Sequence, residues 1–182
     1  MRNWFSICGA DDMFTDLTHA TAPLPFRSRP MIRLKQILVP IDFSPQSERA
    51  SDYGLTLARK FGATVHLLHV IEDPVVYLPM YESYPVPSRQ QFETYAQERL
   101  DNWIPEAVAE GVKIETAWRH GRPDVEIVDY ASDSAIDLIV IGTHGRGMAA
   151  HLLLGSVAEK VVRKAASPVL TVHATGHQFV QS

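Results

Sequence analysis

The sequence lacks the features that mark a disulfide-stapled or membrane-spanning protein. Its 182 residues include one cysteine, Cys8, so no disulfide can form within the chain. That usage suits a reducing compartment, and we expect a cytoplasmic protein. No apolar run approaches the roughly 20 residues that a helix needs to cross a bilayer, so we expect no membrane partner.

An excess of one charge is also missing. Lys and Arg number 17 and Asp and Glu 21, which gives a formal net charge of −4 with no block of like charges. We therefore expect no nucleic-acid partner. Hydrophobic residues make up 46% of the chain and charged residues 21%, a balance typical of one globular domain.

Several enzyme motifs are absent. There is no Gly-x-Ser-x-Gly elbow of a serine hydrolase, no Gly-Lys-Ser/Thr of a Walker loop and no dinucleotide fingerprint. His66 and His69 lie three apart on an expected strand, so they point to opposite faces and cannot share one metal ion. We expect no zinc site.

Residues 1–30 differ from the rest of the chain. They show no sustained helical or strand period, and their three prolines oppose both structures. A signal peptide's order of basic end, apolar stretch and cleavage site is not found. We predict a disordered segment or a start-site extension, with Met31 as the alternative start. A docking peptide that uses Trp4 and Phe5 is the other interpretation.

From Lys35 onward, short apolar runs alternate with helical stripes. The runs predict strands, and the stripes predict helices of which the first begins after the N-cap Ser44 and ends at Gly62. Pro105 should kink or shorten the second helix. The predicted strands are 37–41, 65–70, 112–118, 136–141 and 169–172, and the predicted helices are 45–61, 92–108, 123–131 and 156–165.

This alternation predicts an α/β fold, a doubly wound, five-stranded parallel sheet of Rossmann-like class. We assign residues 31–175 to this domain and residues 176–182 to a C-terminal tail. Residues 73–88, rich in proline and tyrosine, are expected to form a long loop. In open parallel sheets, ligands bind beyond the carboxyl ends of strands where the strand order reverses. That rule directs attention to Asp42, Val70 and the residues from Gly142 onward.

A glycine motif comes after the fourth predicted strand. Gly142 and Gly145 are separated by two residues, and a further nine residues separate Gly145 from Gly155, which precedes the last helix. Glycine lets the backbone approach an anion closely, and the first N–H groups of a helix attract one. Arg146 adds a positive charge, and His144 can donate to a phosphate oxygen. The pattern favours a phosphate site.

Structural alternatives stand beside this interpretation. The loop glycines can serve tight turns alone, and His144 can be exposed without a role. Ser156 can cap its helix in a capping box with Glu159, either instead of contacting phosphate or together with it. Asp42 can be a capping partner of the first helix rather than a ligand contact.

The residues carry a resemblance to a known family. The segments 35–44, 67–70 and 167–172, together with the glycine spacing from Gly142 to Ser156, resemble the universal stress protein family. The resemblance covers about residues 31–173. It implies the strand order 3-2-1-4-5, which places the ends of strands one and four side by side, so that Asp42 and Gly142 face one crevice.

Because all the glycine positions and the final serine are present, the resemblance implies the ATP-binding branch of that family. Asp42 would contact the ribose or an associated metal ion, Mg²⁺ or Mn²⁺. Val70 would hold adenine through its backbone, beside Pro40. The residues that would surround the ribose and phosphates are Gly142, Gly145, Gly155, Ser156 and Val157.

We therefore expect an ATP-binding regulatory protein of the stress response, with protein partners that the sequence does not name. The alternative from another class is a slow Mg²⁺-dependent ATPase or phosphotransferase that uses Asp42 to hold the metal ion. Against it, the sequence offers no clear general base for a water molecule. A third hypothesis is a structural stress module whose glycine loop stays empty.

The fifth strand predicts a homodimer. In the order 3-2-1-4-5 this strand is an edge, and Val169–Val172 carries no charge that would discourage pairing. A twofold axis would join two such edges antiparallel. The resemblance implies the same contact. The alternative is that the tail from His173 to Ser182 covers the edge.

Overall fold

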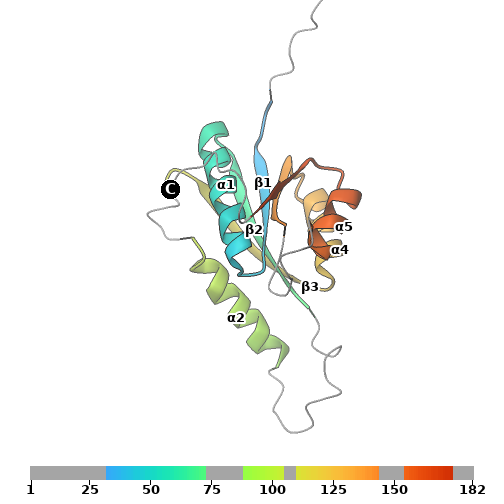
Figure 1. Ribbon diagram of the computed structural model, residues 1–182. Coiled ribbons are helices and arrows are strands. Elements are labelled where there is room, and N and C mark those ends of the chain that lie inside the picture. The colour runs from blue at the N-terminus through green and yellow to red at the C-terminus, as the bar shows by residue number, and fades with distance from the viewer. Residues whose placement is uncertain (1–31, 73–87, 105–109, 144–153, 174–182) are drawn as a thin grey trace, which may run out of the picture. The chain divides into compact units, whose positions relative to one another are not determined.

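Five parallel strands form one sheet in the order β3-β2-β1-β4-β5 (Figure 1). The computed structural model describes residues 32–72, 88–104, 110–143 and 154–173. The chain divides into two units, Met1–Ile32 and Arg33–Ser182, and the sheet belongs to the second. The α/β class and the strand order that the resemblance implied are confirmed.

The elements alternate along the chain as the sequence predicts. In the described residues the strands are β1 (Gln36–Ile41), β2 (Thr64–Ile71), β3 (Lys113–His120), β4 (Leu138–Gly142) and β5 (Val169–Val172). The helices are α1 (Pro45–Phe61), α2 (Arg89–Asp101), α4 (Pro123–Asp133) and α5 (Ser156–Lys164).

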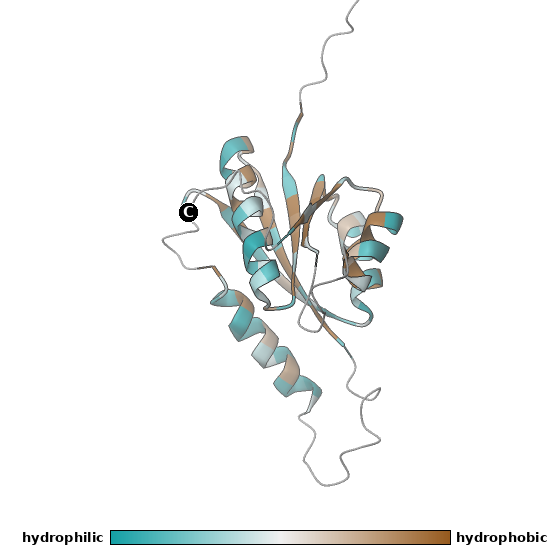
Figure 2. Ribbon diagram, in the orientation of Figure 1, coloured by the Kyte–Doolittle hydropathy of each residue, from teal (hydrophilic) through white to brown (hydrophobic). Residues whose placement is uncertain are grey.

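Helices cover both faces of the sheet. Figure 1 shows α1 and α2 on one face and α4 and α5 on the other. Each layer has its own buried core, and Figure 2 shows that apolar residues concentrate in the strands between the layers. The core under α1 contains Ile37, Val39, Leu55 and Leu67, and the core under α4 and α5 contains Leu38, Leu68, Ile127 and Ile139. The strands are therefore apolar on both faces, as a covered parallel sheet requires.

The first helix begins and ends where its sequence signals lie. The side chain of Ser44 accepts a hydrogen bond from the N–H of Ser47, and Pro45 occupies the first helical position. At the other end Gly62 adopts a left-handed conformation with φ of 66°, which favours glycine.

The second helix is shorter than predicted. It ends at Asp101, and residues 105–108 of the expected helix lie outside the described residues. Ala96 and Leu100 are buried, as the stripe predicts, but Tyr95 is 55% exposed. The sequence predicts one apolar face that includes Tyr95, Ala96 and Leu100; for Tyr95 this prediction is wrong, because the buried face of this helix is narrow and Tyr95 lies outside it.

None of the helices in the described ranges is long and apolar enough to cross a membrane. The predicted loop 73–88 lies outside the described residues except for Ser88, whose side chain accepts a hydrogen bond from the N–H of Gln91 and so caps α2.

Candidate functional site

The carboxyl ends of β1 and β4 diverge at the point where the strand order reverses. The register between these strands pairs Ile37 with Leu138 and Leu38 with Ile139, and it goes no further. By contrast, β1 remains paired with β2 as far as Ile41. This is the point at which the switch-point rule predicts a ligand crevice.

Pro40 explains why the pairing between β1 and β4 stops early. The carbonyl of Gln36 accepts a hydrogen bond from Asp137, just before β4, so alternate residues of β1 from Gln36 onward direct their backbone groups toward β4. Pro40 is in that set and has no N–H to donate. A buried proline in a central strand is therefore tolerated here because it lies where one ladder has ended.

Asp42 closes a tight turn between β1 and α1. Its Oδ1 accepts a hydrogen bond from the N–H of Ser44 at 3.0 Å and another from the hydroxyl of Ser44 at 2.6 Å. The capping alternative for Asp42 is thus realised through Ser44, which is itself the N-cap. Both bonds use Oδ1, and among the described residues Oδ2 receives no hydrogen bond. Asp42 is half-buried, so capping and ligand contact are compatible.

Val70 lies one residue beyond the last position of the β1–β2 register. The N–H of Thr64 donates to Lys35, so alternate residues of β2, Val70 included, direct their backbone groups toward β1. The half-buried Val70 side chain packs on the α4 and α5 face. Its backbone therefore lies beside the Asp42 turn.

Gly142 ends β4 against the first turn of α1. A Cβ atom at this position would lie 2.9 Å from the carbonyl oxygen of Gln46 and 3.0 Å from its carbonyl carbon. These are backbone atoms that cannot move aside cheaply. The glycine is thus explained by close packing, and the same contact places the end of β4 beside the turn of Asp42.

A backbone hydrogen bond joins the two ends of the glycine motif. The N–H of Gly155 donates to the carbonyl of Thr143, and the N–H of Thr143 donates to Val172 of β5 at 2.9 Å. Thr143 is fully buried. Gly155 is thereby held next to the carboxyl end of β4, although eleven residues separate it from Thr143 in the chain.

The capping box expected at Ser156 is wrong. Gly155 is the N-cap of α5, with extended backbone and no side-chain cap, and the exposed Ser156 is the first helical residue. The bond from Gly155 to Thr143 holds Gly155 in the extended conformation of an N-cap. The N-cap therefore lies one position earlier than Ser156, the residue that the sequence pattern suggests. Among the described residues, no side chain caps the first N–H groups of α5, an arrangement compatible with an anion bound there.

The structure brings most of the predicted site residues to one edge of the sheet. Residues Pro40, Asp42, Val70, Gly142 and Gly155 lie at strand ends or are bonded to one, and Ser156 and Val157 form the start of α5. Three others, His144, Gly145 and Arg146, lie outside the described residues.

Asp42 is the only carboxylate among the predicted site residues. No group of three potential metal ligands occurs among the residues that the structure describes. Mg²⁺ commonly binds through one or two carboxylates together with substrate phosphates, so Asp42 fits an ion that arrives with a nucleotide. His66 and His69 do not meet, since His66 contacts Tyr130 of α4 and His69 contacts Phe43 on the other face.

Sequence reasoning missed the residues that hold the Asp42 turn. Phe43 has a φ of 62°, a left-handed conformation unusual for a bulky residue. Ser44, Ser47 and Ser51 are buried along α1. Their spacing of three and four residues was the available signal, because it places three hydroxyls on one helix face.

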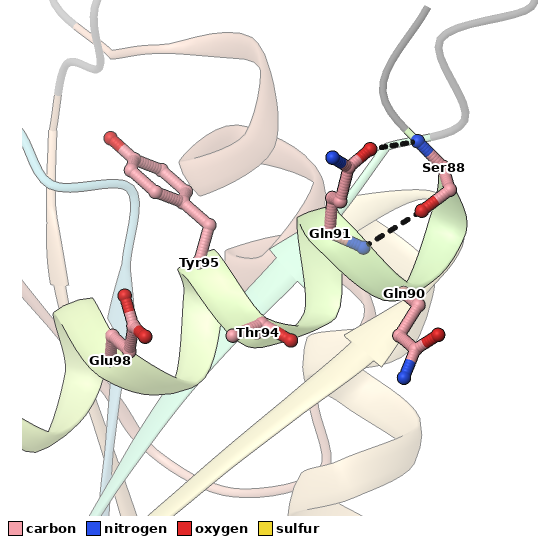
Figure 3. Close-up of a pocket in the computed structure, with 6 residues that line it drawn as sticks. All are labelled: Ser88, Gln90, Gln91, Thr94, Tyr95 and Glu98. Atoms are coloured by element: carbon pink, nitrogen blue, oxygen red, sulfur yellow. Dashed lines mark hydrogen bonds between the residues drawn. The ribbon is translucent and has the colours of Figure 1, made fainter.

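A separate hollow of about 310 Å³ lies along α2. Figure 3 shows that its labelled side chains project from this one helix or its cap in diverging directions. The lining residues are Ser88, Gln90, Gln91, Thr94, Tyr95 and Glu98. Since a ligand site needs groups that converge from several elements, we do not assign a function to this hollow.

Comparison with known proteins adds independent information. The model of the universal stress protein family matches residues 33–173. The chain is 38% identical over 139 residues to universal stress protein MJ0531 of Methanocaldococcus jannaschii, which covers 76% of this chain and 81% of that one. It is 32% identical over 146 residues to universal stress protein YxiE of Bacillus subtilis, with coverages of 75% and 97%.

Solved structures show the same fold. The hypothetical protein MJ0577 of Methanocaldococcus jannaschii superposes with a TM-score of 0.60 at 29% identity, covering 80% of this chain and all of that one. A universal stress protein in complex with cAMP superposes with a TM-score of 0.55 at 26% identity, with coverages of 79% and 100%.

Proposed function

This chain belongs to the universal stress protein family, and from that premise we propose that it is an ATP-binding regulatory protein of the cytoplasmic stress response. The nucleotide would occupy the crevice between the ends of β1 and β4. The domain of residues 31–175 would carry this function, with residues 1–30 and 176–182 outside it.

One observation carries the proposal: the N-cap of α5 is Gly155, which has no side chain to cap the helix, and its N–H is bonded to the residue that comes directly after β4. An anion placed there would accept hydrogen bonds from the N–H groups of Ser156 and Val157 and would lie at the positive end of the helix dipole. The related protein bound to cAMP, a nucleotide with one phosphate, supports a ligand of this class.

The other roles are inferred from position. Asp42 would bind the ribose hydroxyls or a Mg²⁺ or Mn²⁺ ion through Oδ2, because Oδ1 already accepts two bonds from Ser44. Such an ion, when bound, neutralises phosphate charge. Val70 would hold adenine by its backbone, beside Pro40. The proposed phosphate and ribose contacts are Gly142, His144, Gly145, Arg146, Gly155, Ser156 and Val157.

A regulatory role is favoured over ATP turnover. Asp42 is the only carboxylate among the proposed site residues, and because its Oδ2 would contact the ribose or a metal ion, none of these residues supplies a second carboxylate as general base for a water molecule. Incubation of the protein with ATP and Mg²⁺ should therefore release phosphate no faster than a Gly155→Val control. Faster release that requires Asp42 would establish the ATPase instead.

Native mass spectrometry and calorimetry test the proposal. The purified protein should carry nucleotide or take up ATP, and Gly155→Val should abolish uptake while the thermal midpoint stays close to the wild type. A valine side chain would stand where the phosphate must approach. Equal ATP affinity in the variant would show that the phosphate site lies elsewhere.

We also propose a homodimer through β5. The β5 strand is an edge of the sheet, with β4 on one side only. Its sequence Val169–Val172 carries no charge, so its outer edge is open to pairing with a second copy. Light scattering at micromolar concentration should give twice the monomer mass, and a monomer would refute the dimer.

A further inference from the structure

Phe43 is held in its strained conformation by α2 and β2. The guanidinium of Arg99 lies 4.1 Å from the centre of the Phe43 ring. The ring of His69 lies 4.5 Å away, and the ring of Trp103 lies 5.5 Å away in an edge-on arrangement. A left-handed bulky residue costs free energy and persists only where its surroundings fix it. Here those surroundings are rings and a cation from three other positions.

His69 is fixed as well. Its Nδ1 lies 2.7 Å from the carbonyl oxygen of Ile41, and because a carbonyl only accepts, Nδ1 carries the proton. The bond attaches His69 to the last residue of β1, immediately before Asp42. The aromatic cluster therefore surrounds the turn on the face covered by α1 and α2, whereas Val70 and Val157 pack on the opposite face.

Hydrogen bonds connect the same end of α2 to Asp42 by a second route. Trp103 Nε1 donates to the hydroxyl of Ser51 at 2.8 Å, and Ser51 donates to the carbonyl of Ser47 at 2.9 Å. Ser47 donates to the carbonyl of Ser44 at 2.9 Å, and Ser44 donates to Asp42 Oδ1. The three serines are almost fully buried, so this chain of bonds is shielded from water.

We propose that Phe43, clamped by Arg99 and Trp103, is the positioning residue for Asp42, so that the seating of α2 sets the affinity of the nucleotide site. The inference rests on the proposed function. It adds that α2, which covers the face of the sheet opposite to the one on which Val70 and Val157 pack, regulates nucleotide affinity. Two routes that share Trp103, one aromatic and one hydrogen-bonded, run from the end of α2 to the same three-residue turn. Coupling is reciprocal, so bound nucleotide in turn stabilises the seating of α2.

The clamp of Arg99 and Trp103 on Phe43 predicts which substitutions outside the nucleotide site weaken nucleotide binding. Arg99→Gln removes the cation above Phe43, and Phe43→Leu removes the ring; each should weaken ATP binding roughly fivefold, the size of a cation–π contact of about 1 kcal/mol. Phe43→Tyr keeps the ring and should bind as the wild type does. Arg89→Gln changes a charge at the other end of α2, where Arg89 pairs with Glu93, and is the matched control.

Hydrogen exchange gives a readout that needs no nucleotide. The N–H of Ser44 donates to Asp42 Oδ1 and to Ser47 Oγ, so its exchange reports the closure of the turn together with the capping box. In the full chain it should exchange faster in Arg99→Gln and Phe43→Leu than in the wild type or Arg89→Gln, with amides in the middle of α1 unchanged. A merely structural contact would alter thermal midpoint without this local opening.

The outcomes separate the two ideas. If the wild type binds ATP and Arg99→Gln binds it equally well, the coupling is refuted and the nucleotide site stands. If Ser44 exchange is unchanged in Arg99→Gln, the clamp is refuted whatever the affinity. If the wild type binds no ATP, the proposed function fails, and the exchange result alone decides whether α2 holds the turn.

Discussion

The two helix layers of this protein are joined internally by different chemistry. On one face, the end of α2 bonds to α1 through neutral groups, Trp103 Nε1 and the hydroxyl of Ser51. On the other face, α4 bonds to α5 through charge: Lys164 donates to the carboxylate of Asp124 at 2.8 Å, and Lys160 lies 3.8 Å from it. The difference indicates that the bond joining α2 to α1 depends less on pH and salt than the junction between α4 and α5.

Asp124 is the centre of the charged junction. It is 3% exposed, and besides the two lysines it receives hydrogen bonds from Arg122. The hydrogen bond from Lys164 is the main reason that its pKa lies below the usual 3.8, with burial opposing and Arg122 and Lys160 assisting. The carboxylate thus stays ionised in the folded protein because three cations surround it.

The largest expected effect comes from neutralising this junction. Asp124→Asn keeps the shape but removes the charge, and we expect it to lower the free energy of unfolding by about 2 kcal/mol, as for hydrogen bonds to charged groups. Urea unfolding at low and high salt measures the effect. The loss should shrink at high salt, because salt weakens the wild-type junction too. A loss independent of salt would show that packing, not charge, joins α4 to α5.

Acid should loosen the α4–α5 face before the other. Burial is the main cause that lowers the pKa of His66 from its usual 6.5; Glu115 opposes this effect, and Lys113 assists it. His66 bonds to Tyr130 of α4. As pH falls below the unfolded value of 6.5, the unfolded chain binds a proton that the folded chain resists, so stability decreases. Asp124 has a lowered pKa, so its contribution is intact above 3.8 and is lost only below it.

Hydrogen exchange between about pH 7 and about pH 5 tests whether the α4–α5 face loses protection before the α1–α2 face. Amides of α4 should lose protection relative to amides of α1, and His66→Gln should reduce the difference. Equal loss in both helices would contradict the contrast between the layers.

The neutral junction should respond less, and without dependence on salt. Ser51→Ala leaves the Trp103 N–H, donated at 2.8 Å in the wild type, without its acceptor. We expect a loss of about 1 kcal/mol in unfolding free energy, the usual net value of one hydrogen bond. Urea unfolding at the two salt concentrations used for Asp124→Asn should give the same value each time. A salt-dependent loss would mean that Ser51 acts through a charged group.

Local signals determined how much of this structure the sequence could predict. The bounds of β5 and α1 agree with prediction because an apolar run or a pair of caps defines each of them. Strand ends brought Asp42, Val70 and Gly142 to one edge, as the topology rule requires. The cap of α5 was mispredicted because it depends on the bond between Gly155 and Thr143, a contact between residues distant in the sequence.

The residues that support the site could not be predicted from the sequence either, because their contacts also join residues that are distant in the sequence. Nothing local places Arg99 and Trp103 above Phe43, since that depends on how α2 is rotated on the sheet. The packing of Gly142 against Gln46 is likewise invisible until the helix and the strand are placed. Sequence predicts the residues at strand ends; three-dimensional packing determines what holds them.

The smallest expected effect on stability is that of Asp42→Ala. The substitution removes two hydrogen bonds to Ser44, yet Ser44 still caps α1 through its hydroxyl and the N–H of Ser47 at 3.3 Å. We therefore expect a loss of under about 1 kcal/mol, less than that of a whole cap. Nucleotide affinity should fall by more, because the proposed ribose or metal contact is lost outright. Calorimetry with ATP and urea unfolding of the same sample compare the two losses. If stability falls while ATP affinity is unchanged, Asp42 is only a capping residue, and the crevice must hold its ligand through the glycine motif and the start of α5.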